Sequence, residues 1–392
     1  MLLKDIASVK GGKRLPKTDQ LVSYKTNHPY IRIRDMYQSY PLQLNDDFEY
    51  ITDDTYEKIK RYTVEQGDVI LAVVGNTIGL VSLIGESLDG ANLTENCNKI
   101  VDLQQYDNKF LYYYLTSKQG QEEIKKGIIG SSQPKLPIYN IEKFEIPEIS
   151  LDSQKKIVSV LETIDKKINI NEKINNNLEQ QARTIYQNMF ENIDSLPAGW
   201  HKVPLGEVIN ISNKSFNPLK EPETLLEHYS IPAYDDAKFP VFELSTEIKS
   251  NKFIIDDSCF MISKLNPTTK RVWRPYCLTN NAVCSTEFIV YKAKEESLTD
   301  YLYSVINSDS FSEFMCSHVT GSTGSRQRTT PKDTLFFEVL VPTEEELETF
   351  KTTVAPMYAQ MRNIAIENNK LKETRDALLP RLMSGEIDVS NV

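Results

Sequence analysis

Basic side chains gather beside glycines and a strand-like segment in the first part of the chain. Four cations, Lys13 and Arg14 among them, fall within residues 10–17, and the alternation at 31–34 places Arg32 and Arg34 on one face of a predicted strand. Guanidinium groups pair with phosphate oxygens and with the O6 and N7 acceptors of guanine. These cations therefore suit phosphate or guanine.

A second basic cluster lies beside turns in the later part of the chain. The turns are residues 266–269 and the glycine- and serine-rich residues 321–325, and the cations are Lys264, Lys270, Arg271, Arg274, Arg326 and Arg328. Arginine reads guanine, and asparagine or glutamine reads adenine, through paired hydrogen bonds to base edges. The alternative interpretation of both clusters is a solvated charged face.

The motifs of common catalytic and cofactor sites do not occur in the sequence. It contains no G-x-G-x-x-G, no G-x-x-x-x-G-K-[ST] and no H-E-x-x-H, and it has no adjacent prolines such as those of a D-P-P-Y or N-P-P-F methylation loop. Its four histidines follow no metal-ligand spacing. We therefore expect no cofactor, metal or catalytic residue in this chain.

One weak pattern favours a nuclease. Asp235 and Asp236, followed by Glu247 and Lys249, crudely fit two acids and a lysine around Mg²⁺. The same E-x-K triplet recurs at residues 123–125, within a predicted helix, so it arises readily by chance. A nuclease centre is therefore the third hypothesis.

Charge and composition restrict the possible partners. The 392 residues carry 45 basic and 55 acidic side chains, a net charge of -10, so any contact with nucleic acid must be local. The longest apolar run, residues 69–74, is too short to cross a membrane, and residues 1–5 open no signal peptide, which predicts a cytoplasmic protein without membrane contact. The five cysteines, an odd number without a C-x-x-C pair, are expected to be unpaired thiols.

The sequence repeats itself, which predicts two copies of one structural plan. The matching segments are residues 3–9 and 205–211, 67–72 and 257–262, 110–114 and 301–305, 146–147 and 341–342, and 175–178 and 368–371. Each copy ends in a long polar segment with apolar residues at heptad spacing.

These two segments predict long helices that pair along an apolar seam. The first seam carries Ile157, Leu161, Ile164, Ile168, Ile174, Leu178, Ala182, Ile185 and Met189. The second carries Phe350, Val354, Met357, Met361, Ile364, Asn368, Leu371, Leu378 and Leu382. Polar Asn171 and Asn175 cross the first seam and Arg375 interrupts the second, while Pro356 is expected to kink or start the second helix.

The order along the chain is therefore globule, helix, globule, helix. We predict an α+β fold with globular residues 1–150, a helix at 151–195, globular residues 196–341 and a helix at 342–392. Each globule mixes short β-branched runs with one helical stretch, near residues 110–126 in the first. The breaker cluster at residues 197–199 marks the boundary between the halves.

Several motifs in this order resemble the specificity subunits of type I restriction–modification systems. They are G-S-S-Q-P-K-L at 130–136, F-E-I-P at 144–147, Q-K-K-I at 154–157, L-P-A-G-W at 196–200 and L-L-P-R-L-M-S-G at 378–385. Together with the duplicated plan, the resemblance covers essentially the whole chain. The second copy departs from it, since Leu347 stands where the first has Gln154.

The resemblance implies a non-catalytic reader of double-stranded DNA. Two target recognition domains would each bind one half of a bipartite asymmetric site, and the helices would pair as an antiparallel coiled-coil spacer in a pseudo-twofold repeat. Two methylation subunits would bring S-adenosylmethionine, and restriction subunits, which translocate and cleave DNA, would bring ATP and Mg²⁺. A coiled-coil scaffold or adaptor that does not bind DNA is the alternative.

The resemblance also places loops toward DNA at residues 75–79, 264–267 and 324–328. With the basic clusters, these loops give the candidate DNA-binding residues Lys13, Arg14, Arg32, Arg34, Asn76, Thr77, Lys264, Asn266, Arg271, Arg274, Arg326, Gln327 and Arg328. The candidate helix-pairing residues are Ile157, Leu161, Ile164, Ile168, Leu178, Met357, Met361, Ile364, Leu371 and Leu378.

Overall fold

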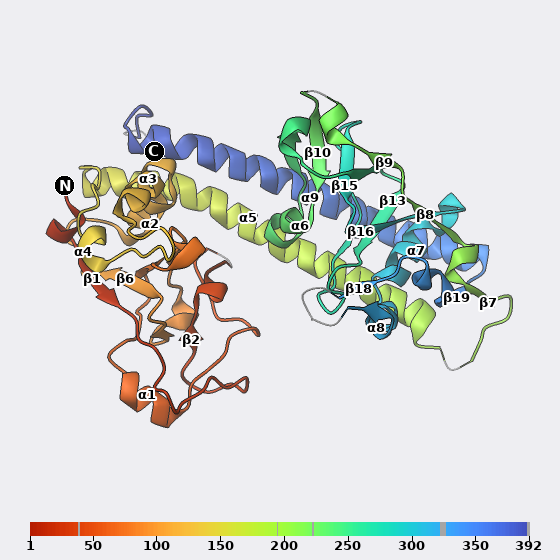
Figure 1. The fold of residues 1–392 in the computed structure, drawn as a ribbon, viewed down its shortest axis with the longest axis horizontal. Helices are drawn as coiled ribbons and strands as arrows, with labels where there is room; N and C mark the ends of the chain where they lie inside the picture. The colour runs from red at the N-terminus through yellow and green to blue at the C-terminus, as the bar shows by residue number, and fades with distance from the viewer. Residues whose placement is uncertain (38–39, 194, 222, 322–326, 390–392) are drawn as a thin grey trace. The chain divides into compact units, whose positions relative to one another are not determined.

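The computed structural model describes residues 1–37, 40–193, 195–221, 223–321 and 327–389. The chain forms two compact units: unit 1 is Met1–Asn171 with Lys370–Val392, and unit 2 is Glu172–Asn369. Each unit contains a β-sheet, short helices and one end of each of two long helices (Figure 1).

Unit 1 is built on a four-stranded antiparallel sheet in the order β1-β6-β3-β4. Its strands are β1 (Ser8–Gly11), β3 (Val69–Ala72), β4 (Val81–Leu83) and β6 (Cys97–Val101). Strand β3 is buried on both faces, because Val69 and Leu71 pack in one core cluster while Ile70 and Ala72 pack in another. Burial of both faces explains why this segment is a continuous apolar run.

Shorter elements complete unit 1. They are the parallel pair β2 (Tyr30–Ile31) and β5 (Asn92–Leu93), and the helices α1 (Asp53–Ile59), α2 (Asn108–Thr116), α3 (Lys118–Gly127) and α4 (Ile138–Ile141). The expectation of one helical stretch near 110–126 is wrong, because the chain divides it at Ser117. Ser117 takes an extended conformation, and its hydroxyl accepts the N–H of Gly120 at 3.1 Å as the cap of α3.

Unit 2 repeats this plan. Its four-stranded antiparallel sheet has the order β14-β13-β16-β8, the counterpart of β4-β3-β6-β1. The matching elements are β8 (Ile209–Ser212), β13 (Cys259–Ser263), β14 (Val272–Trp273), β16 (Phe288–Ala293), α7 (Thr299–Ile306) and α8 (Asp309–Ser317). The predicted internal repeat is confirmed.

Unit 2 also has strands beyond its four-stranded sheet. A five-stranded sheet has the order β11-β10-β15-β12-β9, and two short antiparallel pairs are β7 with β19 and β17 with β18. The remaining elements are β7 (His201–Pro204), β9 (Ser215–Phe216), β10 (Leu225–Tyr229), α6 (Ile231–Ala237), β11 (Val241–Leu244), β12 (Lys252–Ile254), β15 (Ala282–Ser285), β17 (Val319–Thr320), β18 (Arg328–Thr329) and β19 (Glu338–Val341).

The two long helices are α5 (Leu151–Tyr186) and α9 (Glu344–Met383). A π-helical turn, Gln187–Glu191, follows α5. Pro356 does not start α9, which begins at Glu344 and continues through it. Both Pro356 and Thr352, whose carbonyl would have accepted the missing N–H, are exposed, so water can replace the lost bond.

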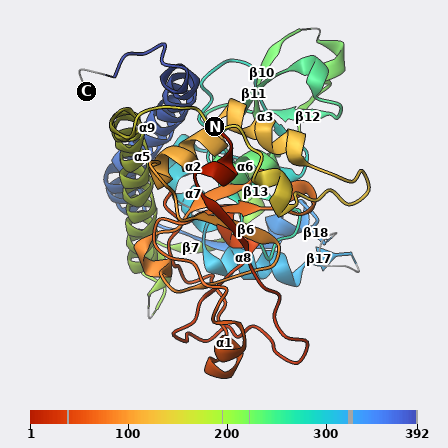
Figure 2. The ribbon, with the colours of Figure 1, turned by 90° about the vertical axis from the view of Figure 1, so that its left-hand side faces the viewer.

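The helices lie side by side (Figure 2) and pack in an antiparallel sense within each unit (Figure 1). In unit 1 the beginning of α5, with Ile157 and Leu161, shares a core cluster with Leu379 and Leu382 near the end of α9. In unit 2 the end of α5, with Ala182 and Tyr186, shares a cluster with Phe350 and Val354 near the beginning of α9. The predicted α+β fold with two paired long helices is confirmed.

Most candidate helix-pairing residues are turned from solvent. Ile157, Leu161, Ile168 and Ile364 are buried, and Ile164, Leu178, Met357, Met361, Leu371 and Leu378 are half-buried. Ile174 is 41% exposed and does not belong to the seam, whereas Asn171 is buried. The 4,3 spacing from Ile164 and Ile168 leads to Asn171 and then to half-buried Asn175, which leaves Ile174 outside it.

The departure at Leu347 is compensated by a neighbouring residue. In the first copy, buried Gln154 accepts the N–H of Asp107 at 2.9 Å and donates to the carbonyl of Ile149 at 2.7 Å. In the second copy Leu347 packs in the core, and Glu346 accepts the indole N–H of Trp200 at 2.6 Å. Both arrangements tie the start of a long helix to its preceding globule.

Arg375, the interruption of the second seam, belongs to a buried polar network in unit 1. Its Nη1 lies 2.8 Å from Oδ1 of Asp165, and the hydroxyl of Tyr113 donates to Oδ2 of the same carboxylate at 2.6 Å. Asp165 and Tyr113 are both almost fully buried. The network therefore fixes α5 against α2 and α9 within this unit.

The described residues contain neither a disulfide nor a helix long and apolar enough to cross a membrane. All five cysteines are free thiols, and Cys97, Cys259 and Cys284 are buried. Burial raises the pKa of the Cys97 thiol to about 12, which disfavours its reactive thiolate.

Arg375→Ala should destabilise unit 1 by about 3–5 kcal/mol, because the buried carboxylate of Asp165 would lose its cation. Arg381→Ala, which removes an exposed ion pair with Glu386 on the same helix, should cost less than about 1 kcal/mol. Urea unfolding followed by circular dichroism measures both. Equal losses from the two variants would contradict a structural role for the buried network.

Candidate functional site

Two loops meet where the central strand of unit 1 ends. The N–H of Gly75, just after β3, donates to the carbonyl of Pro134 at 2.9 Å, and Val74 forms an antiparallel bridge with Lys135. The N–H of Leu136 then donates to the carbonyl of Val73 at 2.9 Å. These bonds join the loop after β3 to the glycine- and serine-containing residues 130–136.

The same contacts recur at the end of β13 in unit 2. The N–H of Asn266 donates to the carbonyl of Gln327 at 2.9 Å, Leu265 bridges Arg328, and the N–H of Thr329 donates to Lys264 at 3.1 Å. Asn266 has φ +52°, and its counterpart Gly75 has φ +62°. Both therefore make the same left-handed turn, which glycine and asparagine adopt at least cost.

A third segment completes each arrangement. The N–H of Val73 donates to the carbonyl of Asn96 at 2.9 Å, and the N–H of Lys264 donates to that of Glu287 at 2.9 Å. We call each meeting point a strand-end corner. The first corner consists of Val73, Gly75, Asn96 and Lys135, and the second consists of Lys264, Asn266, Glu287 and Arg328.

The second corner holds a fixed guanidinium. Arg328 donates from Nε to Oε2 of Glu287 at 3.0 Å and from Nη2 to Oε1 at 3.2 Å, while 43% of its side chain stays exposed. This hydrogen-bonded carboxylate and its charge raise the pKa of Arg328. A bidentate pair fixes the plane of the guanidinium, so its exposed part has a defined direction.

Three cations of the predicted second cluster have side-chain partners outside the four residues of this corner. Arg271 forms a bidentate pair with Asp235, with Nη2 and Oδ2 2.9 Å apart, and its side chain is only 13% exposed. Arg274 pairs with Asp300 and lies over the rings of Tyr303 and Tyr358, at 6.0 and 5.6 Å. Lys270 donates to the carbonyls of Asn307 and Ser308 at the end of α7.

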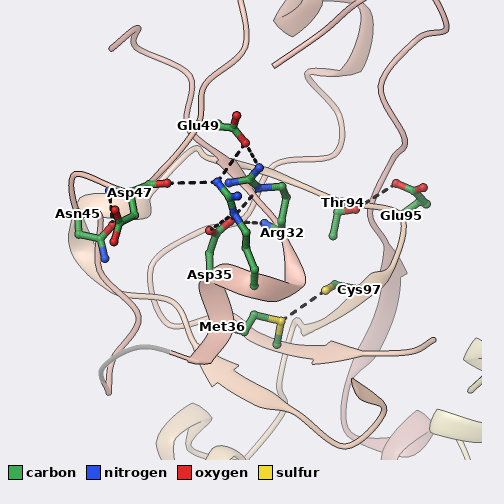
Figure 3. A network of polar contacts seen from close by, with 10 residues as sticks. Arg32, Asp35, Met36, Asn45, Asp47, Glu49, Thr94, Glu95 and Cys97 are labelled. Atoms are coloured by element: carbon green, nitrogen blue, oxygen red, sulfur yellow. Dashed lines mark hydrogen bonds and ion pairs between the residues drawn. The ribbon is translucent and has the colours of Figure 1, made fainter. Parts of the chain in front are cut away.

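In unit 1, the residues 31–34 do not form the expected strand. β2 ends at Ile31, and Ile33–Tyr37 form a 3₁₀ helix. Buried Asp35 causes the turn, because its carboxylate accepts the N–H of Arg32 at 2.8 Å (Figure 3).

Arg32 and Arg34 still meet through Glu49. Arg32 pairs with Glu49 and is 19% exposed, whereas Nη2 of Arg34 lies 3.1 Å from Oε2 of Glu49 and its side chain is 60% exposed. Arg32 is therefore a structural cation, and Arg34 is the one available to a ligand.

Arg32 and Arg34 line an open hollow of about 400 Å³ together with Arg14, Asn96 and Tyr30. Arg14 is 79% exposed and donates from Nε to Oε1 of Glu95 at 2.6 Å. Burial opposes ionisation of Glu95. Hydrogen bonds from Arg14, from the backbone of Glu95 and from Thr94 outweigh the effect of burial, so the pKa of the Glu95 carboxyl is lowered. Because Asn96 belongs to both, the hollow adjoins the first strand-end corner.

The remaining candidates in the loops have simple positions. Asn76 is exposed, and the hydroxyl of Thr77 donates to the carbonyl of Val74 at 2.7 Å within the turn Gly75–Thr77. Exposed Lys13 has its ammonium 5.5 Å from the centre of the Tyr62 ring. Lys264, Asn266 and Gln327 lie at the second corner, and Arg326 lies outside the described residues.

Comparison with known proteins identifies the family. Residues 1–180 match the family described as "Type I restriction modification DNA specificity domain". The chain is 22% identical over 432 aligned positions to the MjaIX specificity subunit of Methanocaldococcus jannaschii, covering 100% of this chain and 93% of that protein. It is 20% identical over 406 positions to the HindI specificity subunit of Haemophilus influenzae, covering 83% and 87%.

The chain belongs to the specificity subunits of type I restriction–modification systems. A crystal structure of the S subunit from M. genitalium has the same fold, with a TM-score of 0.56 at 16% identity over 97% of this chain and 95% of that one. The resemblance predicted from the motifs is confirmed. The protein is a DNA specificity subunit and not a catalytic one.

Four corner residues of this specificity subunit, Val73, Asn96, Lys135 and Glu287, were not among the residues predicted from the sequence. Lys135 stands inside the recognised motif at 130–136, but the shared G-S-x-Q pattern at 130–133 and 324–327 would pair it with Thr329, and only the backbone bridges show that it corresponds to Arg328. Asn96 and Glu287 carry no sequence signal, because only the backbone bonds of Val73 and Lys264 reveal that they are equivalent.

The nuclease pattern does not assemble in the specificity subunit. Asp235 is paired with Arg271, and the carboxylate of Glu247 accepts the N–H of Leu244 at 3.1 Å at the start of a 3₁₀ turn. Among the described residues, no three histidine, cysteine or acidic side chains gather as metal ligands.

Arg32→Ala should destabilise unit 1 by about 1.5–3 kcal/mol, because buried Asp35 and Glu49 would lose a charged hydrogen-bond partner. Arg34→Ala removes a more exposed side chain and should cost less than about 1 kcal/mol. Urea unfolding of the two variants gives the comparison. Arg34→Ala being the more destabilised would reverse the roles assigned to the two arginines.

Proposed function

We propose that this specificity subunit reads a bipartite, asymmetric site in double-stranded DNA, with one target recognition domain in residues 1–150 and the other in 196–341. The observation that carries this proposal is the recurrence of the strand-end corner. Each sheet brings three loops together at the end of its central strand, with a cation at the same backbone position, Lys135 or Arg328. Two similar reading surfaces with different side chains suit two different half-sites.

The charges of the corners support a local contact with DNA. The chain has a net charge of -10, so its cations must be concentrated where phosphates approach. Arg14 and Arg34 are 79% and 60% exposed beside the first corner, and Lys264 and Arg328 lie at the second. Carboxylates hold Arg14, Arg34 and Arg328 in place and leave them exposed. This arrangement favours defined contacts with DNA over a diffuse charged face.

The candidate residues divide into two roles under this proposal. The guanidinium of Arg328, fixed by Glu287, and the amides of Asn76, Asn266 and Gln327 suit base edges in the major groove. Highly exposed Arg14 and Lys13 suit phosphates, which fix register without reading sequence. Arg271, Arg274 and Arg32 are paired with carboxylates and less exposed, and they would stabilise the domains.

We also propose that the helical segments 151–195 and 342–392 hold the recognition domains and carry two methylation subunits. One supporting observation is that Ile170 and Ile174, one turn apart on α5, are 54% and 41% exposed. The methylation subunits would supply S-adenosylmethionine, and restriction subunits would supply the ATP- and Mg²⁺-dependent steps. This chain would contribute recognition and docking surfaces only.

Replacing residues 196–341 with the equivalent domain of another specificity subunit should change one half-site and leave the other unchanged. The test is genome-wide sequencing of methylated adenines in cells that carry the complex, compared with cells that lack it. A change in both half-sites would contradict independent domains. A complex that assembles and binds no DNA would favour the coiled-coil scaffold.

The purified chain alone should neither methylate nor cut DNA, because the proposal assigns both reactions to partner subunits. Incubation of plasmid DNA with Mg²⁺, S-adenosylmethionine and the chain measures both activities. Metal-dependent cleavage that Glu247→Ala abolishes would instead support the nuclease hypothesis.

A further inference from the structure

We infer that the pairs Asn96–Lys135 and Glu287–Arg328 occupy the equivalent specificity-determining position of the two recognition domains, with Glu287 as the positioning residue for Arg328. This inference rests on the proposed DNA-reading function. It adds which residues make the two half-sites different.

The equivalence follows from backbone geometry. Lys135 forms antiparallel bridges on two sides, with Val74 and with Ile129. Arg328 likewise lies between Leu265 and Thr320, through the bridge to the first and the β17–β18 pairing with the second. The two cations therefore occupy the middle position of the same three-segment arrangement.

The neighbouring position is equally well defined. Val73 donates its N–H to Asn96 and accepts from Leu136, each at 2.9 Å. Lys264 donates to Glu287 at 2.9 Å and accepts from Thr329 at 3.1 Å. Because the residue after the central strand links both partners, Asn96 corresponds to Glu287 just as Lys135 corresponds to Arg328.

The side chains at these matched positions have different chemistry. Glu287 holds Arg328 through two hydrogen bonds of 3.0 and 3.2 Å, which restricts the guanidinium to one plane. In the first corner a neutral amide replaces the carboxylate, and no ion pair of Lys135 is found among the described residues. A lysine is a rotatable point charge, whereas a fixed guanidinium matches two acceptors of one base.

The two corners should therefore discriminate bases differently. A guanidinium held in one plane selects a base with paired acceptors, so the second corner should read one base pair strictly. An asparagine amide offers donor and acceptor groups, and a lysine offers a rotatable point charge, so the first corner should prefer a different base. Neither residue pair is needed for the fold of its sheet, since the joining bonds are between backbone groups.

The test exchanges the pairs in the full complex with its methylation subunits. Glu287→Asn with Arg328→Lys gives the second corner the residues of the first, and Asn96→Glu with Lys135→Arg makes the reciprocal change. Each exchange should alter preference at one base pair of one half-site, by about 5- to 150-fold in relative binding, and leave the other half-site unchanged. Selection of bound sequences from a randomised DNA pool measures this, and methylated-adenine sequencing confirms it.

Glu287→Gln isolates the positioning role, because it keeps the shape and removes the charge. It should relax preference at the same base pair that Arg328→Lys affects. Asp235→Asn is the matched control, since it breaks another bidentate arginine pair in the same unit without altering Glu287 or Arg328, and it should leave sequence preference unchanged. Thermal unfolding of each variant confirms that the fold is retained.

The outcomes separate this inference from the proposed function. If the unaltered complex selects no bipartite sequence, the proposed function fails. If it selects one, and neither exchange alters preference at a base pair, the corner pairs do not determine specificity. A uniform loss of binding to every sequence would mark phosphate contacts and would also overturn the inference.

Discussion

The position of the candidate reading surface depends on the backbone groups of one residue in each unit. Val73 and Lys264 follow the central strands, and each donates its N–H to one loop and accepts at its carbonyl from another. Three segments distant in sequence are held together in this way without any side chain. The side chains at the corners are therefore free to differ, while the sheets beneath them keep the same order.

Paired charges reconcile an acidic protein with a DNA-reading role. Arg14, Arg34 and Arg328 each contact a carboxylate and yet remain at least 43% exposed. A carboxylate that neutralises part of the charge weakens attraction to phosphate in general, but it also fixes the direction of the guanidinium. Such an arrangement lowers the non-specific affinity for DNA and favours directional contacts. More enclosed pairs, such as Arg271 with Asp235, stabilise the domain instead.

The two copies of the plan have diverged by compensated exchanges along the helices. In unit 1, Tyr113 on α2 donates to Asp165 on α5, whereas in unit 2 Ser304 on α7 lies 3.0 Å from the hydroxyl of Tyr358 on α9. The tyrosine lies on the short helix in unit 1 and on the long helix in unit 2. In both units a hydrogen bond joins the short helix to a long helix. Buried polar groups require such compensation, because an unpaired one costs more than the pair contributes.

The sequence by itself determined the repeat, the apolar run at residues 69–74, the two long helices and the family. These features are periodic or local, since an apolar run or a heptad seam is read from neighbouring residues. The resemblance to the family also pointed to the loops at 75–79 and 264–267.

Only the tertiary structure decided which cations act together. It separated Arg271 and Arg274 from Arg328, turned residues 33–37 into a 3₁₀ helix through Asp35, and brought Asn96 and Glu287 to the corners. Glu287 and Arg328 are 41 residues apart, and no spacing rule links them. Their pairing depends on Lys264, the residue after β13, whose backbone bonds to Glu287, just before β16, and to Thr329 of β18. These hydrogen bonds join distant segments and follow no local pattern.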